Sequence, residues 1–139
     1  MDGLITNSAT RYFYRFWRPE TAARNGDAGG NPKTEANSDF TPFITTPCHP
    51  SYPSAHASIS YAARRVVHGL WGNGGHSIAL TVPSLPQMMP HYTSLKQITD
   101  DIDNARVYAG IHFRFDQEAG ARGGGLVGTS MGTSTTCAV

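Results

Sequence analysis

Glycine and proline constrain the fold of this chain more than any other feature. Its 139 residues include fifteen glycines and nine prolines. Both types interrupt regular structure, because glycine is conformationally free and proline lacks a backbone N–H. They break up the polar stretch 20–52 and the stretch 76–92, which contains Pro83, Pro86 and Pro90. We therefore expect a long loop over 20–52 and an extended connector over 76–92.

The clearest helix is expected over residues 54–71. Pro53 suits the entry to a first helical turn, Ser51 or Ser54 can cap it, and Gly72 follows the last turn. Apolar side chains recur here at the three- and four-residue spacing of one helix face. They are Ile59, Ala62, Ala63, Val66, Val67 and Leu70.

A second helix of about four turns is expected from Leu95 to Ile111. Thr93 or Ser94, followed by Gln97, offers a capping box at its start. Apolar residues repeat at helical spacing through this stretch, so the extended connector is expected to end at the cap.

Two further segments have a weaker helical pattern. Residues 9–17 are dense in aromatic side chains and fit a helix that ends at Pro19, although a strand period fits so short a run as well. A helix after Phe115 is expected to be weakened by glycine, and the small, polar tail 128–139 is expected to fray. The weakening glycines are Gly120, Gly123, Gly124 and Gly125.

The charge balance excludes some classes of protein. Eleven Lys and Arg face ten Asp and Glu, a net charge of +1, which excludes nucleic-acid binding through bulk charge and a highly charged disordered tail. The sequence contains no run of about eighteen apolar residues, so it predicts no membrane-spanning helix. The first residues lack the basic start and apolar stretch of a signal peptide. Cys48 and Cys137 lie far apart in the sequence, and we expect two unrelated thiols rather than a disulfide.

Three arginines mark the first aromatic segment. Arg11 and Arg18 are seven residues apart, which puts them on one face if the segment is helical, and Arg15 lies between them. Planar guanidinium groups suit phosphate-like oxygens, and stacked ones repel unless an anion lies between them. The pattern therefore indicates either an anion site or a solvated basic face.

The tetrapeptide Pro53-Ser54-Ala55-His56 lies where the Pro-rich loop enters the 54–71 helix. Backbone N–H groups at a helix start have no partner within the helix and favour an anion. Ser54 adds a hydroxyl donor, and His56 can exchange a proton near neutral pH. The alternative is an N-cap serine beside a surface histidine.

A third cluster contains Arg106, His112 and Asp116. Asp116 follows His112 by four residues, so a helical backbone would stack the two side chains. A carboxylate that accepts from one ring nitrogen leaves the other free as a ligand or nucleophile. Arg106 adds a third positive charge. The alternative is a local surface salt bridge.

Together the clusters contain three arginines, two histidines, a helix N-terminus and one acid that can orient a histidine. Such a set matches a trianionic oxyanion of tetrahedral or trigonal-bipyramidal shape, because each charge-assisted hydrogen bond contributes about 1.5–3 kcal/mol. The three segments are thus expected to fold around one oxyanion.

These motifs resemble the vanadium-dependent haloperoxidase and phosphatidic acid phosphatase type 2 superfamily, on its haloperoxidase side. The resemblance implies an all-α fold, the C-terminal half of a helical bundle with long Pro/Gly-rich loops, as one domain over residues 1–139. Family members have a long helical region before the first motif, so we expect this chain to be truncated at its N-terminus. The similarity covers about residues 11–125 and rests on Phe16-Trp17-Arg18-Pro19, Tyr52-Pro53-Ser54-Ala55-His56 and His112-Phe113-Arg114-Phe115-Asp116.

By this resemblance the cofactor is vanadate, and phosphate can occupy the same site. The implied reaction is oxidation of a halide by hydrogen peroxide to hypohalous acid, with a small organic molecule as acceptor. His112 would be the nitrogen ligand of the metal, Asp116 would hold His112, and His56 would be the acid–base group. The vanadate oxygens would be bound by Arg11, Arg18, Arg106, Ser54 and the backbone N–H of Ala55.

His49 bears on the choice of halide. It precedes His56 by seven residues, as a second histidine does in the bromoperoxidases that this chain resembles, so bromide or iodide is expected rather than chloride. The alternative is an ordinary loop histidine. Two positions depart from the family pattern, because Arg11 stands where lysine is usual and Ala55 where glycine is usual.

Two other functions are compatible with the sequence. One is an acid phosphatase of the same superfamily, in which His112 would form a phosphohistidine and His56 would act as general acid. The other is a non-catalytic oxyanion-binding remnant, in view of the short chain and the changes at Arg11 and Ala55. Relatives are often secreted or periplasmic, and a homo-oligomer is compatible with the sequence.

Overall fold

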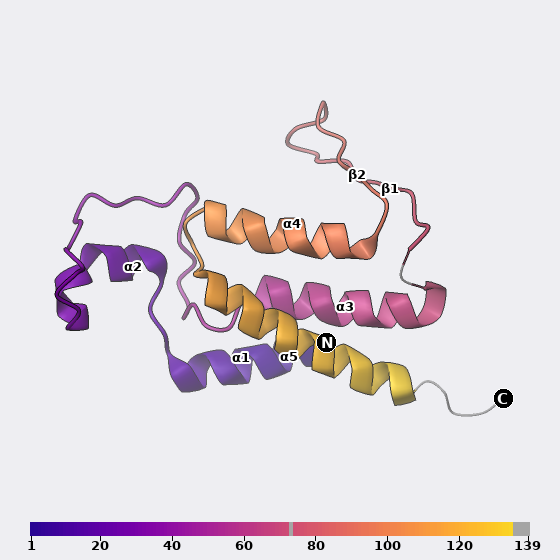
Figure 1. The fold of residues 1–139 in the computed structure, drawn as a ribbon, viewed down its shortest axis with the longest axis horizontal. Helices are drawn as coiled ribbons and strands as arrows, with labels where there is room; N and C mark the ends of the chain where they lie inside the picture. The colour runs from indigo at the N-terminus through magenta and orange to yellow at the C-terminus, as the bar shows by residue number, and fades with distance from the viewer. Residues whose placement is uncertain (73, 135–139) are drawn as a thin grey trace.

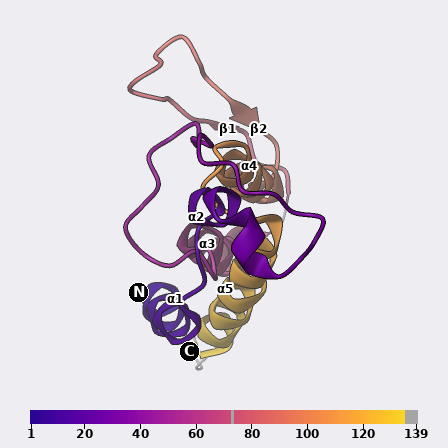
Figure 2. The same cartoon turned by 90° about the vertical axis from the view of Figure 1, so that its left-hand side faces the viewer.

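The computed structural model describes residues 1–72 and 74–134 and shows a helical bundle. Helix α3 (Ala55–Trp71) lies at its centre and packs most extensively against α5 (Arg114–Ser134), then against α4 (Leu95–Tyr108) and α1 (Asp2–Tyr14). Figure 1 shows α4, α3 and α5 side by side, with α1 along the lower edge, and Figure 2 looks along them from one end. The predicted all-α bundle is confirmed, apart from one two-stranded sheet.

Helices α3 and α4 begin where the sequence predicts. The Ser54 side chain caps α3 by accepting from the N–H of Ala57 at 3.3 Å. The capping box of Ser94 and Gln97 is complete at the start of α4. Helix α4 ends at Tyr108, before the predicted Ile111, because the chain turns away through Gly110 at a φ of 74°.

Helix α1 differs from the helix predicted over 9–17. It begins at Asp2 and ends at Tyr14, because Arg15 takes a left-handed conformation with a φ of 49°. The chain thus leaves the helix before Pro19. The prediction that Arg11 and Arg18 share one helix face is therefore wrong, since Arg11 lies on α1 and Arg18 lies beyond its end.

The two predicted loops contain short elements. Helix α2 (Pro19–Arg24) and the 3-10 helix Gly26–Gly29 lie in or at the edge of the stretch 20–52, and α2 has proline at its first position. In the connector 76–92, strand β1 (Ile78–Ala79) pairs antiparallel with β2 (His91–Tyr92). The rest of both stretches is irregular, as predicted.

Helix α5 continues through glycines that were expected to weaken it. A Cβ atom on Gly120, Gly124 or Gly128 would lie 2.5, 2.0 or 2.6 Å from a backbone carbonyl oxygen of α3 or its N-cap. These three positions, each four residues apart, therefore let the two helices approach closely. The predicted fraying from residue 128 is wrong as far as Ser134, and residues 135–139 lie outside the described part of the chain.

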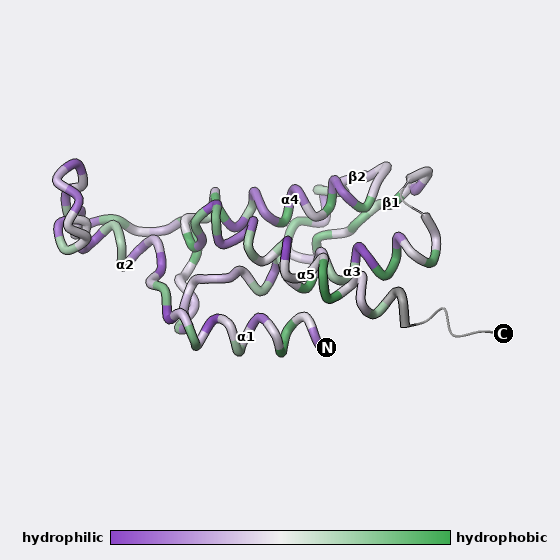
Figure 3. The backbone as a smooth tube through the Cα atoms, turned by 60° about the horizontal axis from the view of Figure 1, so that its bottom comes forward, coloured by the Kyte–Doolittle hydropathy of each residue, from purple (hydrophilic) through white to green (hydrophobic). Residues whose placement is uncertain are grey.

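The buried residues are mostly polar. Three hydrophobic residues are buried in the described part of the chain, namely Ala57, Ala109 and Ile111. Many large apolar side chains are exposed instead, and the colours in Figure 3 alternate between hydrophobic and hydrophilic along α3 and α4. The buried polar and charged residues are Asn7, Arg11, Arg18, Ser51, Ser54, Ser58, Thr99, Asp103, His112, Asp116 and Gln117.

Two further sequence predictions concern membrane-spanning helices and the pairing of the cysteines. Among the described helices, none combines the length and apolar character needed to cross a bilayer. Cys48 is exposed and forms no disulfide within the described residues. Cys137 lies outside the described residues, so the prediction that the two cysteines are unpaired stays a prediction.

Candidate oxyanion site

Three segments far apart in the sequence meet at one end of the bundle. The N–H of Ser51 donates to the carbonyl of Phe16 at 2.9 Å, and the N–H of Ser54 donates to the carbonyl of Asp116 at 2.9 Å. Arg18 Nη1 also donates to the carbonyl oxygen of Ile111, at 2.7 Å. These bonds join the loop after α1, the turn before α3 and the start of α5, which carry the three sequence clusters.

His112 and Asp116 form a buried pair at the centre of this end. His112 Nδ1 lies 2.9 Å from Asp116 Oδ2, and both side chains are almost fully buried. The same oxygen accepts from the N–H of Phe113 at 3.0 Å and from the hydroxyl of Ser51. His112 lies in the turn before α5 rather than on a helix, so Asp116 reaches back to it from the first helical turn.

The partners of His112 determine its tautomer. Arg18 Nη1 lies 3.1 Å from His112 Nε2, and a guanidinium group can only donate. His112 Nε2 therefore accepts, and Nδ1 carries the hydrogen that is donated to Asp116. Burial lowers the pKa of His112, and the Arg18 charge lowers it too, although Asp116 opposes both. The ring is thus neutral at pH 7, with the lone pair of Nε2 facing Arg18.

Arg11 and Arg18 are both buried at this end of the bundle, where Arg18 contacts His112 and both arginines contact His49. Arg11 Nη2 donates to the carbonyl of Pro53 at 3.0 Å, and Arg18 Nε donates to the carbonyl of His49 at 2.9 Å. Neither arginine lies within ion-pair distance of a carboxylate in the described residues. Burial, reinforced by the Arg11 charge, lowers the pKa of Arg18 to about 10, so both groups remain charged at pH 7.

Arg106 comes from the last turn of α4, and its charge acts on the residues of this site. Its positive charge lowers the pKa of His56, His112 and Arg18. Burial lowers the pKa of Arg106 itself. The Nε atom of Arg106 is buried and has no hydrogen-bond partner in the described residues, and the same is true of Arg11 Nε. Two charged donors at this end thus lack an acceptor.

The start of α3 forms the remaining side of the site. The Ser54 hydroxyl accepts from Ala57, which leaves its hydrogen for another acceptor. Ala55 is the first helical residue, so its N–H has no partner within the helix. His56 follows in the first turn, and its side chain is exposed. Partial desolvation lowers its pKa, and the charges of Arg106 and Arg11 lower it further.

The structure thus gathers the sequence-predicted residues at one end of the bundle. It leaves Arg15 outside this site and adds Ser51 and Asn7 to it. Arg15 is exposed and donates to the carbonyl of Tyr12 at 3.2 Å, away from the cluster. Two residues were not predicted as part of this site. Ser51 was considered only as a helix cap, and its hydroxyl donates to Asp116. The amide of Asn7 donates to the carbonyl of Pro53 at 3.2 Å and to the hydroxyl of Ser58 at 2.9 Å.

Comparison with known families agrees with the geometry of this end. Residues 1–137 match the family model described as the VCPO second helical-bundle domain. The chain belongs to this family. The resemblance to the vanadium haloperoxidase superfamily, C-terminal portion, is thereby confirmed. None of the curated proteins matches the chain.

Solved structures of vanadium-dependent peroxidases share the fold. A bacterial vanadium-dependent iodoperoxidase matches at 28% identity over 92% of this chain, with a TM-score of 0.78. An apo-type bacterial vanadium-dependent chloroperoxidase matches at 19% identity over 96% of this chain, with a TM-score of 0.71, which shows likeness of fold. The chain spans 29% of the first protein and 34% of the second, so it corresponds to about a third of their length.

Proposed function

We propose that this chain carries the vanadate-binding part of a vanadium-dependent haloperoxidase, which oxidises a halide with hydrogen peroxide. The observation that carries the proposal is the gathering of three partly or fully buried arginines at the end of the bundle that also holds a neutral, buried histidine. Arg11, Arg18 and Arg106 have no ion-pair partner in the described residues, and Arg18 lies 3.1 Å from His112 Nε2. Family membership supports the proposal.

The residues present fit an oxyanion. The buried Nε atoms of Arg11 and Arg106 lack acceptors, and an unpaired buried donor is costly unless a ligand satisfies it. No group of three His, Cys, Asp or Glu side chains that could hold a metal cation occurs in residues 1–72 and 74–134. The charged donors at this end are guanidinium groups, so the donor set is cationic and suits the oxygens of vanadate, with phosphate as an equivalent guest.

Each group would then have one task. Arg11, Arg18, Arg106, the Ser54 hydroxyl and the N–H of Ala55 would bind oxygens. Vanadate, when bound, supplies a Lewis-acid centre that activates hydrogen peroxide without changing its own oxidation state. His112 Nε2 would present its lone pair to the metal, in place of accepting from Arg18.

Two further residues would control protons. Asp116 accepts the Nδ1 hydrogen of His112 and so keeps the Nε2 lone pair available. The lowered pKa of His56 keeps this exposed ring neutral at pH 7, so it can take a proton from an incoming peroxide and return one to a leaving hydroxide. The two histidines thus have different tasks because one is buried beside a carboxylate and the other faces solvent.

The halide is proposed to be bromide or iodide. Two observations support this choice. His49 lies beside Arg11 and Arg18 in the site. The iodoperoxidase is the one relative among those described above that exceeds a quarter identity. The hypohalous acid would go on to halogenate a small organic acceptor.

The experiment uses the 139-residue chain with orthovanadate. Isothermal titration with orthovanadate should show binding, and with hydrogen peroxide and bromide or iodide the protein should halogenate a phenolic dye. His112→Ala should abolish halogenation, whereas His91→Ala, on the distant β2 strand, should leave it unchanged. Cleavage of a phosphate ester with a blank dye assay would show a phosphatase instead. Binding without either activity would show a non-catalytic oxyanion-binding protein.

A further inference from the structure

The His49 ring lies between the two arginines of the first cluster. Arg11 Nη1 is 2.7 Å and Arg18 Nη2 is 2.8 Å from His49 Nδ1. Because guanidinium groups only donate, the two arginines share the single lone pair of Nδ1, and Nε2, which lies 3.4 Å from Arg11 Nη1, carries the ring hydrogen. The carbonyl of Pro50, 3.2 Å from Nδ1, is itself an acceptor and so is not a partner of Nδ1 in this tautomer. His49 is thus a neutral acceptor shared by two cations.

His49 determines which edge of Arg18 faces His112. The carbonyl oxygen of His49 accepts from Arg18 Nε at 2.9 Å, and the ring nitrogen accepts from Arg18 Nη2. The backbone and the ring of one residue therefore hold the same edge of the guanidinium. The remaining nitrogen, Nη1, is left for His112 Nε2 and the carbonyl of Ile111.

His49 has a similar effect on Arg11. Arg11 Nη1 is taken by His49 and Nη2 by the carbonyl of Pro53, which leaves Nε as the buried donor without a partner. A fork of this kind needs arginine, because a lysine ammonium has no fixed second edge. Arg11 and His49 thus form a matched pair.

We infer that His49 is a positioning residue that aligns Arg11 and Arg18 for oxyanion binding through its Nδ1 atom and its carbonyl oxygen. This inference rests on the proposed function and deepens it. It differs from a halide-binding role, because it acts through Nδ1 and the carbonyl oxygen, both of which contact the arginines, and needs no contact between the ring and a halide. Holding two like charges beside each other needs such an acceptor, since the Arg11 charge already lowers the pKa of Arg18.

Three variants at position 49 test the role of Nδ1. The side-chain oxygen of asparagine lies as far from the backbone as Nδ1 does, whereas the glutamine oxygen reaches the place of Nε2. Orthovanadate and inorganic phosphate are titrated into wild-type protein, His49→Ala, His49→Asn and His49→Gln. His49→Ala should weaken both affinities about tenfold, which corresponds to about 1.4 kcal/mol. His49→Asn should restore most of the affinity, and His49→Gln should not.

Each outcome has one meaning. Absence of binding by folded wild-type protein would overturn the proposed function itself. Binding by wild-type protein that His49→Ala leaves unchanged would overturn only the role of His49. Equal affinities of the Asn and Gln variants would do the same, because a merely space-filling residue would not discriminate between them. If His49→Ala does not fold, the Asn and Gln variants, with thermal midpoints as a check, still decide.

Discussion

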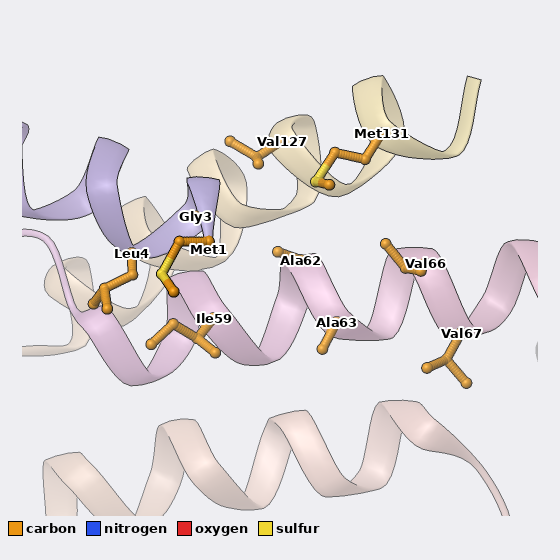
Figure 4. A pocket seen from close by; sticks show the side chains of 10 residues that line it. All are labelled: Met1, Gly3, Leu4, Ile59, Ala62, Ala63, Val66, Val67, Val127 and Met131. Carbon is orange, nitrogen blue, oxygen red and sulfur yellow. The ribbon is translucent and has the colours of Figure 1, made fainter. Parts of the chain in front are cut away.

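The site end of the bundle and the flank formed by α1, α3 and α5 are built in opposite ways. At the site end, charged side chains such as Arg18 and Asp116 are buried and bonded to other segments. On the flank, an apolar groove of about 460 Å³ is open to solvent, and Ile59 remains 45% exposed. Figure 4 shows the lining of this groove: Met1, Gly3, Leu4, Ile59, Ala62, Ala63, Val66, Val67, Val127 and Met131.

This difference indicates that different interactions determine the structure of the two regions. Burial of apolar area stabilises by about 25 cal/mol per Å², but little of that area is removed from water on the flank. The site end instead depends on hydrogen bonds between segments, each with a partner of defined position. A substitution should therefore be more disruptive near His112 than in the groove, and matched pairs of variants can measure this.

The largest effect is expected where α5 touches α3. Gly124→Ala would place a Cβ atom 2.0 Å from the carbonyl oxygen of Ser58, so the helices must separate and unfolding free energy should fall by about 3 kcal/mol or more. Gly123→Ala meets nothing within 4 Å and should be neutral or stabilising by up to about 1 kcal/mol. Urea denaturation of both variants gives the two values. Equal losses would show that the close approach does not matter.

Two isoleucines compare the regions directly. Ile111 is fully buried beside His112, and its truncation to alanine should cost about 3 kcal/mol. Ile59 lies in the groove at 45% exposure, so the same truncation should cost less than about 1 kcal/mol. Thermal denaturation compares them at one pH. A loss at Ile59 as large as that at Ile111 would contradict the contrast between the regions.

Two acid–base pairs at the same i, i+4 spacing extend the comparison. Asp116→Asn removes a buried carboxylate that accepts from His112, Phe113 and Ser51, and it should cost about 2 kcal/mol. Asp100→Asn breaks the exposed pair with Lys96 and should cost about 0.3 kcal/mol. Chemical denaturation measures both losses, and an Asp116 variant as stable as the Asp100 variant would be evidence against a structural role for the buried pair.

Orthovanadate titration of these two aspartate variants separates stability from binding. Asp116→Asn should also weaken orthovanadate binding, because an amide oxygen no longer favours the same histidine tautomer as strongly. Asp100→Asn should bind as wild type does. Unchanged binding by Asp116→Asn would show that the carboxylate is needed only for folding.

Much of this architecture could be predicted because it depends on local sequence. The caps at Ser54 and Ser94 act over three residues, so their patterns are visible without knowledge of the fold. The three motifs also identified the residues that gather at one end. Their convergence was predicted from chemistry, since three arginines, two histidines, a helix N-terminus and one orienting acid together match a single oxyanion.

The rest could not be predicted, because it depends on contacts between distant segments. Glycine lowers helix propensity, yet Gly124 lies in a helix because α3 approaches it closely. Arg11 and Arg18 contact the same ring although they are on different elements, since the helix ends at Arg15 and His49 bridges the two side chains. Ser51 bonds Asp116 across 65 positions of sequence, and no local pattern shows this.

The smallest predicted effect is the pH dependence of stability without added oxyanion. Burial lowers the pKa of His112 below its ordinary value of about 6.5. The unfolded chain then binds a proton at a higher pH than the folded chain does, so unfolding free energy should fall as pH drops below about 6.5 and stay level above it with respect to this group. The lowered pKa values of His49 and His56 act in the same direction.

Urea denaturation between pH 5 and pH 8 measures how steeply the unfolding free energy depends on pH, and His112→Gln should reduce this slope. An unchanged slope in His112→Gln would mean that the buried ring is not a source of the acid sensitivity, and that the site end differs from the flank in hydrogen bonding but not in proton binding.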